Sequence, residues 1–257
     1  MELPFSYDLN FEKMANDFSS DPESLSILGF EKPRERIVKV NEFRNELAIH
    51  EASHFVFHQL LSKDLTESYF IGHAVICTEN IKLNEVNLKP SPYYKKYNIR
   101  LYFIDDRRRL VVHLLSLIAG YSSSREFISS EKFYIFSEVS DQKNGTLKVK
   151  YCCLENHRFC CTDDFGRINE LLRDYYSNPD YIERIKILKR LTSLAQSIMR
   201  NEQVQRSIHL VKDALLKNEC KKIEGEELEV LKKSVNELIS DLDFTGILEE
   251  LKDEIKY

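Results

Sequence analysis

The chain has 257 residues, with 37 basic and 42 acidic side chains, which gives a formal net charge of −5 at pH 7. This acidic balance disfavours binding to phosphate backbones, so we expect no nucleic-acid partner. Hydrophobic residues make up 42% of the chain and charged residues 31%, a composition that excludes a disordered protein and is typical of a globular chain with one sizeable core.

The seven glycines are widely separated along the chain. Phosphate-binding loops and dinucleotide-binding motifs need glycines within a few residues of one another, so the sequence indicates no nucleotide-hydrolysing module. The longest uncharged run, Leu110 to Ser124, is shorter than the ~20 apolar residues of a membrane span. The N-terminus also lacks a basic segment followed by an apolar one. We therefore expect no membrane span and a cytoplasmic location.

The six cysteines include two adjacent pairs, Cys152-Cys153 and Cys160-Cys161. Neighbouring cysteines are poorly placed to bridge each other, and the expected compartment is reducing, so we predict reduced thiols. A metal site made of these four residues and His157 is the weaker interpretation, because the ligand spacing of zinc modules is absent.

The first 41 residues are predicted to be a lead-in with little regular structure, ending in a short strand or an approach segment at 36–40. Apolar periodicity then predicts a helix from Glu42 to Ser62. Aromatic and β-branched runs at 69–77 and 99–104 predict strands of a small sheet, joined by a long loop that contains two prolines.

A second helix is predicted from Arg107 to Gly120, with the glycine as its terminator. Strands at 133–139 and 146–153 flank an Asn-Gly pair that favours a hairpin turn. Beyond Asp163 the chain is predicted to be helical almost to its end, since its last proline is at 179. One packing face is predicted there from five apolar residues, namely Ile185, Leu188, Leu191, Leu194 and Ile198.

These elements predict an α+β fold that is predominantly helical. Its expected parts are a zincin-type helix, indicated by the pattern HExxH at residues 50–54, a small β-sheet and a C-terminal helical bundle. In domain terms, residues 1–41 form the lead-in, residues 42–178 the catalytic core, and residues 179–257 a helical region packed on that core.

The chemistry is carried by the first helix, which contains His50, Glu51 and His54 in the pattern HExxH. Chance alone gives about 0.02 such matches in a chain of this composition. The two histidines lie one helical turn apart and point within ~40° of each other, so both imidazoles can reach one Zn²⁺. Glu51 is then beside the metal, where a general base is needed. His58 is ~12 Å from His50 along the axis and is expected to support the site or pack in the core.

The third ligand must come from far along the chain, because no further histidine follows at the spacing of the extended motif. Two acidic candidates are Asp164 and Glu170. Both offer the oxygen donors that zinc accepts. The residues alone leave the choice between Asp164 and Glu170 open, while Asp163 is expected to cap a helix or to face solvent.

The chain resembles the peptidase domain of FtsH-like zinc metalloproteases over roughly residues 42–235. That family's helix reads HEAGH, where this chain has His50-Glu-Ala-Ser-His54. Its distant aspartate is followed by leucine, where this chain has Asp164-Phe165. The apolar helix ending near Gly120 and the segments Ala214-Leu215-Leu216 and Gly225-Glu226-Glu227 are also similar. Glu170, in contrast, belongs to a short stretch that looks like the third-ligand helix of thermolysin-type enzymes.

The resemblance implies a zinc metallopeptidase with Zn²⁺ held by His50, His54 and Asp164, and with Glu51 as the base. Peptides or unfolded proteins would be its substrates. The family's ATPase and membrane segments are not expected here, so any ATP dependence would come from a separate partner protein, and a homo-oligomer is a further possibility. The alternative function is a catalytically silent interaction protein with a peptidase fold, which could still bind zinc.

Overall fold

The computed structural model describes residues 34–62, 69–77, 84–90, 107–127, 134–142, 146–153, 164, 168, 171 and 181–254. In chain order its elements are β1 (Arg34–Lys39), α3 (Val40–Leu61), β2 (Tyr69–Val75), β3 (Glu85–Pro90), α6 (Arg107–Phe127), β4 (Tyr134–Gln142), β5 (Thr146–Cys153), α8 (Tyr181–Met199), α9 (Glu202–Lys217), α10 (Gly225–Leu238) and α11 (Thr245–Glu254). The predicted α+β class with mostly helical structure is confirmed for these residues.

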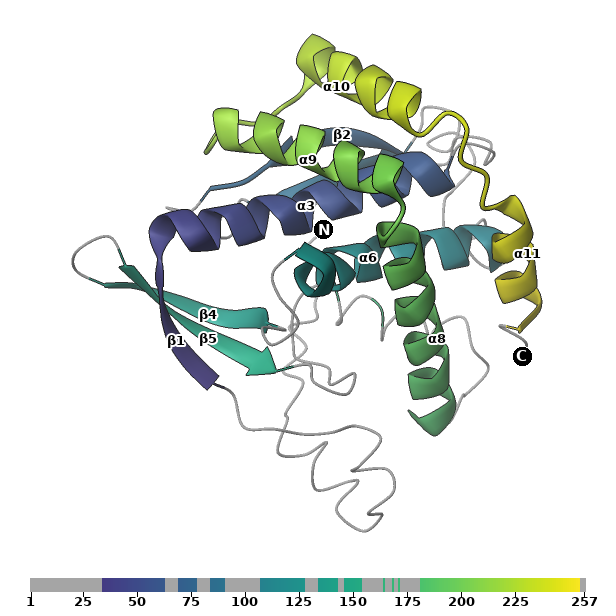
Figure 1. Ribbon diagram of the computed structural model, residues 1–257, viewed down its shortest axis with the longest axis horizontal. Coiled ribbons are helices and arrows are strands. Elements are labelled where there is room, and N and C mark those ends of the chain that lie inside the picture. The colour runs from purple at the N-terminus through teal and green to yellow at the C-terminus, as the bar shows by residue number, and fades with distance from the viewer. Residues whose placement is uncertain are drawn as a thin grey trace.

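Helix α3 is the centre of the fold. It packs against α9 on one side and α6 on the other, and α10 lies beyond α9 (Figure 1). Its buried residues point in all directions around the helix, from Phe43 and Leu47 to Phe57 and Leu61. A helix with one exposed face would show a single apolar stripe, so this pattern identifies α3 as a core helix. The motif predicted to bind metal therefore lies on a helix that is packed by other elements on most of its sides.

The strands form two small antiparallel sheets. One has the order β1-β5-β4, so the N-terminal strand pairs with the second strand of the predicted hairpin. The other consists of β2 and β3. Strand β3 was not predicted, because its residues include Pro90 and lie in what the sequence indicated to be a loop. The strand predicted at 99–104 lies outside the described residues.

Helix α6 continues through Gly120 for another seven residues, to Phe127. The prediction that Gly120 ends this helix is wrong. Glycine lowers the intrinsic stability of a helix interior, but Leu114, Leu115 and Ile118 are fully buried and hold the surrounding turns. Tertiary packing therefore outweighs the local signal.

Three of the five residues of the predicted packing face of α8 contact the core, and the side chains of Ile185 and Leu188 lie outside the described part of the structure. Leu191 and Ile198 of α8 are buried in the core, and Leu194 packs against it. A two-residue turn separates α8 from α9, where the Asn201 side chain accepts hydrogen bonds from the backbone N–H groups of Gln203 and Val204. These bonds satisfy donors that a helix N-terminus otherwise leaves free, so Asn201 defines the start of α9.

The prediction of reduced cysteines is wrong for one pair. Cys77 follows β2, Cys220 lies between α9 and α10, and their sulfur atoms form a disulfide across 143 residues of sequence. The prediction considered the adjacent pairs, whereas this bond depends on contacts between distant segments. The side chains at 152, 153, 160 and 161 lie outside the described part of the structure.

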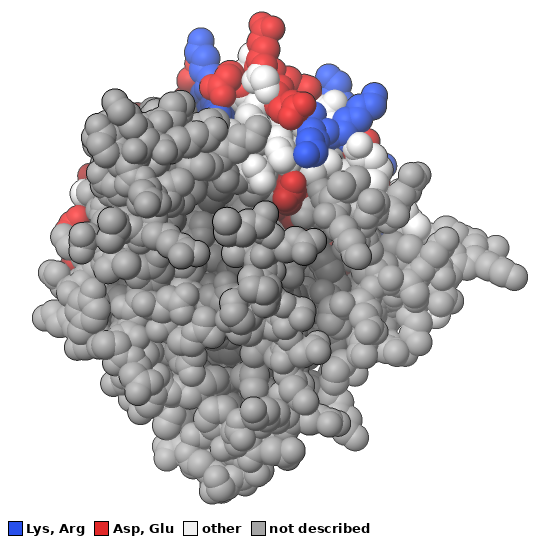
Figure 2. All heavy atoms as spheres, turned by 180° about the vertical axis from the view of Figure 1, so that it is seen from behind, with Lys and Arg blue, Asp and Glu red and all other residues white. Residues whose placement is uncertain are grey.

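Within the described ranges, no helix has an apolar stretch long enough to cross a bilayer. Near the top of the face seen in Figure 2, where α10 lies, acidic and basic side chains lie close together. Charges of both signs on one surface are typical of a solvated helix face rather than of a phosphate-binding patch.

His58 is buried in the core, with 6% of its surface exposed. Burial, together with His113 of α6 and Lys232 of α10, lowers its pKa from 6.5 to about 3. The unfolded chain binds a proton at His58 below about pH 6.5, whereas the folded chain does not. Above about pH 6.5 His58 is therefore neutral in both states and does not affect the free energy of unfolding. As the pH falls from 6.5 towards 3, the free energy of unfolding decreases by up to about 1.4 kcal/mol per pH unit.

We therefore expect His58→Gln to flatten the fall in unfolding free energy between about pH 6.5 and pH 3. Urea unfolding at several pH values measures this slope. The matched control is His209→Gln, since His209 is exposed on α9. An unchanged slope in the His58 variant, or an equal change in the control, would show that His58 is not the titrating group.

Candidate metal centre

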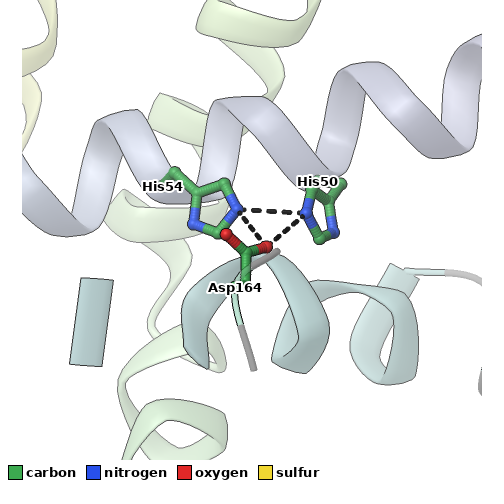
Figure 3. A group of neighbouring side chains, drawn as sticks. All are labelled: His50, His54 and Asp164. Atoms are coloured by element: carbon green, nitrogen blue, oxygen red, sulfur yellow. Dashed lines mark hydrogen bonds and ion pairs between the residues drawn. The ribbon is translucent and has the colours of Figure 1, made fainter. Parts of the chain in front are cut away.

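His50 and His54 lie one turn apart on α3 and point to the same side of the helix (Figure 3). Their Nε2 atoms are 3.0 Å apart. The two rings are nearly perpendicular, with an interplanar angle of 88°. This arrangement brings two nitrogen donors together without stacking the rings, which leaves room for a shared ligand atom or ion.

Asp164 supplies the third donor. Its Oδ2 atom lies 3.2 Å from the Nε2 of His50 and 3.2 Å from the Nε2 of His54. The three side chains converge from α3 and from a distant part of the chain, as Figure 3 shows. This group of one carboxylate and two imidazoles could hold a metal ion.

The donor separations fit a tetrahedral zinc ion. Ligand atoms ~2.05 Å from a tetrahedral centre are ~3.3 Å from one another, because the edge of a tetrahedron is ~1.63 times its centre-to-vertex distance. The donors here are 3.0, 3.2 and 3.2 Å apart. Only a small outward movement of the side chains would be needed. A set of three protein ligands also leaves the fourth position open, as in catalytic zinc sites.

A backbone carbonyl orients the second histidine. The Nδ1 atom of His54 lies 2.7 Å from the carbonyl oxygen of Ser116 on α6. A carbonyl can only accept, so Nδ1 donates, and the Nε2 lone pair of the neutral ring is left facing the other two donors. Helix α6 thus selects the tautomer that binds metal.

The charges in the site favour a cation. Burial opposes the charged form of Asp164, but the charge on His54 and the hydrogen bonds from both histidines together outweigh this and hold the pKa of Asp164 well below its usual range. Burial likewise opposes the imidazolium of His54, but the neighbouring carboxylate outweighs it and raises the pKa of His54 to about 9. An ionised carboxylate is therefore present throughout the neutral range. A metal ion has to displace the His54 proton in order to bind.

Glu51 is buried, with 6% of its surface exposed. Burial raises its pKa, although His54 and His50 counteract part of the rise. None of the ion pairs between described residues involves Glu51. A carboxyl group in this setting has a higher proton affinity than one in water, which is what a general base near neutral pH requires.

Gly120 lets α6 approach the two histidines closely. A Cβ atom at this position would lie 2.5 Å from His54 Nε2 and 2.6 Å from His50 Cε1. Real Cβ atoms do not come so near, so only a glycine fits against the metal-facing edges of the rings. This explains why a glycine occupies the interior of α6 despite its cost to the helix.

We therefore expect Gly120→Ala to displace one or both imidazoles and to weaken zinc binding by about tenfold to a hundredfold. Competition with a chromogenic chelator measures the affinity. Gly246→Ala is the matched control, since nothing lies within 4 Å of a Cβ atom there. Equal affinity in the two variants would exclude a steric role for Gly120.

The sequence identified His50, Glu51, His54 and Asp164, and the structure brings the donor atoms of the two histidines and the aspartate together. Asp163 and Glu170 lie outside the described residues. The contributions of Ser116 and Gly120 were missed. The only signal for them was a small-residue segment at the end of an apolar helix, and that segment indicated a helix terminus equally well.

No protein-family model matches the chain, and no curated protein matches it at a significant level. The interpretation of this site therefore depends on its residues and their geometry.

Proposed function

We propose that the protein is a zinc metallopeptidase. His50, His54 and Asp164 would hold Zn²⁺, and Glu51 would act as the general base in the hydrolysis of peptide bonds. The single observation that carries this proposal is the convergence of three donor atoms at 3.0–3.2 Å from one another, beside a buried glutamate with no ion-pair partner among the described residues. A structural histidine pair would need neither the aspartate nor the glutamate.

A bound zinc ion would polarise the scissile carbonyl and lower the pKa of a water molecule towards ~7. The residues of the chain would do the rest. Glu51 would accept a proton from the attacking water and pass it to the leaving amine. Ser116 would keep His54 in its metal-binding tautomer through the 2.7 Å contact with Nδ1. Because α3 is tightly packed, it would keep the relative positions of these side chains fixed during the reaction.

The resemblance to FtsH-like peptidases supports the same assignment, because it is carried by the HExxH helix and by the aspartate that reaches it from 110 or more residues away. The substrates that we propose are peptides and unfolded chains, as the resemblance implies.

Metal removal tests the proposal. Purified protein is expected to contain about one zinc ion per chain, as measured by inductively coupled plasma mass spectrometry. Dialysis against 1,10-phenanthroline should abolish cleavage of unfolded casein, and added Zn²⁺ should restore it. Since peptidase activity is easily contributed by impurities, the restored activity must also be lost in the Glu51 variant discussed below. A chain that retains stoichiometric zinc but cleaves nothing would favour the interaction protein, and a chain without zinc would contradict both schemes.

A further inference from the structure

The Cys77–Cys220 disulfide joins the end of β2 to the connection between α9 and α10. The two sulfur-bearing residues differ in exposure. Cys77 is buried, with 3% of its surface exposed, whereas Cys220 is exposed. A reagent in solution therefore meets the bond from the side of Cys220.

Backbone hydrogen bonds reinforce this junction. The N–H of Cys220 donates to the carbonyl of Ile76 at 2.7 Å, and Ala74 and Ile223 exchange both backbone hydrogen bonds, at 2.8 and 3.1 Å. The connection thus adds a short antiparallel segment beside β2. Arg44 of α3 also contacts this region: it donates one hydrogen bond to the Leu216 carbonyl at 2.8 Å and forms an ion pair with Glu219.

The connection is not in a relaxed conformation. Cys220 has φ of 60°, and among the described residues it is the one non-glycine residue with positive φ. This left-handed conformation is unfavourable for a residue with a Cβ atom, and surrounding structure must maintain it. The covalent bond to Cys77 is a strong constraint of that kind, so breaking it is expected to release the connection.

Two exposed lysines, Lys221 and Lys222, directly follow Cys220. The nearest acidic residue in sequence, Glu219, is paired with Arg44. Two positive charges adjacent in sequence to the exposed cysteine would attract anionic reagents and favour an attacking thiolate, and both effects would accelerate thiol–disulfide exchange at this sulfur.

We propose that the Cys77–Cys220 bond is a redox-controlled clasp, which anionic thiols of the glutathione class open by forming a mixed disulfide at Cys220. The thiolate attacks the Cys220 sulfur, and Cys77 leaves as a thiolate that takes a proton from water. A second thiolate then attacks the sulfur of the attached thiol and releases Cys220, so two thiols are oxidised to one disulfide while the protein bond is reduced. The oxidised form of the same thiol closes the clasp by the reverse steps.

Opening would loosen the C-terminal helices from the core. Helix α9 packs along α3 and is tied to it at its C-terminal end by Arg44. Once the connection detaches from β2, this end of α9 and the start of α10 lose their covalent attachment to the sheet. The clasp thus controls the support of the helix that carries His50 and His54.

Peptide mapping tests the site of attack. The full chain is first oxidised with glutathione disulfide, then exposed briefly to reduced glutathione, acid-quenched and alkylated. The expected product carries glutathione on Cys220 and the alkyl group on Cys77. An adduct on Cys77 instead, or a bond that does not open, would overturn the proposal.

The role of the lysines is tested with K221A/K222A. At low ionic strength this variant should open about threefold more slowly with glutathione, and the slowing should be smaller with 2-mercaptoethanol, whose thiolate carries less negative charge. Equal rates with glutathione in the variant and the wild type would contradict selection for anionic thiols. Both substitutions are at exposed positions, so the fold should be retained.

The clasp itself is tested by comparing the oxidised chain, the chain reduced with a phosphine, and Cys77→Ser. Both open forms should have a Tm lower by about 10 °C, because the bond closes a long loop in the unfolded chain, and faster amide exchange in 74–77 and 218–224. The phosphine-reduced chain supplies the result if Cys77→Ser does not fold. Unchanged exchange in these two segments would show that the bond is not a clasp. None of these measurements uses peptidase activity, so they stand apart from the proposed function.

Discussion

Glu51→Gln is expected to lower peptide hydrolysis by about a thousandfold while the zinc content remains that of the wild type. The amide has nearly the same shape as the carboxylate but cannot accept a proton from water, and the loss of a general base typically costs 10²–10⁴ in rate. Glu51 is buried beside the donors but is not one of the three that converge. Cleavage of a quenched fluorescent peptide gives kcat/KM, and metal analysis of the same sample gives the zinc content.

The control for this substitution is Glu42→Gln, which removes the same charge from an exposed position on the same helix. We expect its activity to equal that of the wild type. If Glu51→Gln cleaves as fast as Glu42→Gln, Glu51 is not the base. If it loses its zinc as well as its activity, the glutamate contributes to the metal site, and the division of roles proposed above is wrong.

Asp164→Ala is expected to weaken zinc binding by two to three orders of magnitude. Structural zinc sites with four protein ligands have binding free energies of about 10–16 kcal/mol, so each ligand contributes roughly 2.5–4 kcal/mol. The carboxylate also supplies the negative charge that compensates the cation in a half-closed site where water screens it poorly. Affinity is measured by chelator competition at constant pH.

Glu170→Ala is the matched variant, since Glu170 is the other acidic residue that the sequence offers as a third ligand. Its zinc affinity should equal that of the wild type. Circular dichroism of both variants separates loss of a ligand from loss of the fold. A loss of zinc in Glu170→Ala and not in Asp164→Ala would reverse the assignment, although Asp164 Oδ2 lies 3.2 Å from both histidines.

The fold gives the site two different kinds of support. On one side, α9 buries Val204, Ile208 and Val211 in the core shared with α3 and fixes the position of the helix. On the other side, α6 contributes the Ser116 carbonyl, which accepts from His54, and one turn later Gly120, whose lack of a side chain leaves room for both imidazoles. The first support is general packing, and the second is specific to the two imidazoles. Substitutions in α9 should therefore affect stability first, whereas those at 116–120 should affect metal binding first.

Several elements were predictable because their signal is local. The HExxH helix, the hairpin of β4 and β5 and the long C-terminal helices follow from periodicity and turn residues within a few positions of each other. The pairing of His50 with His54 follows from the helix repeat alone. By itself, then, the sequence determined that one helix carries two histidines one turn apart and a glutamate next to the first of them.

Only the tertiary structure decided which distant groups meet that helix. Asp164 reaches the histidines across 110 or more residues, and Cys77 meets Cys220 across 143. Strand β3 forms where a proline indicated a loop, and Gly120 lies inside a helix that it was expected to end. In each case the free energy of packing and pairing between remote segments exceeds the weak local preference, and no pattern within a short stretch of sequence records those contacts.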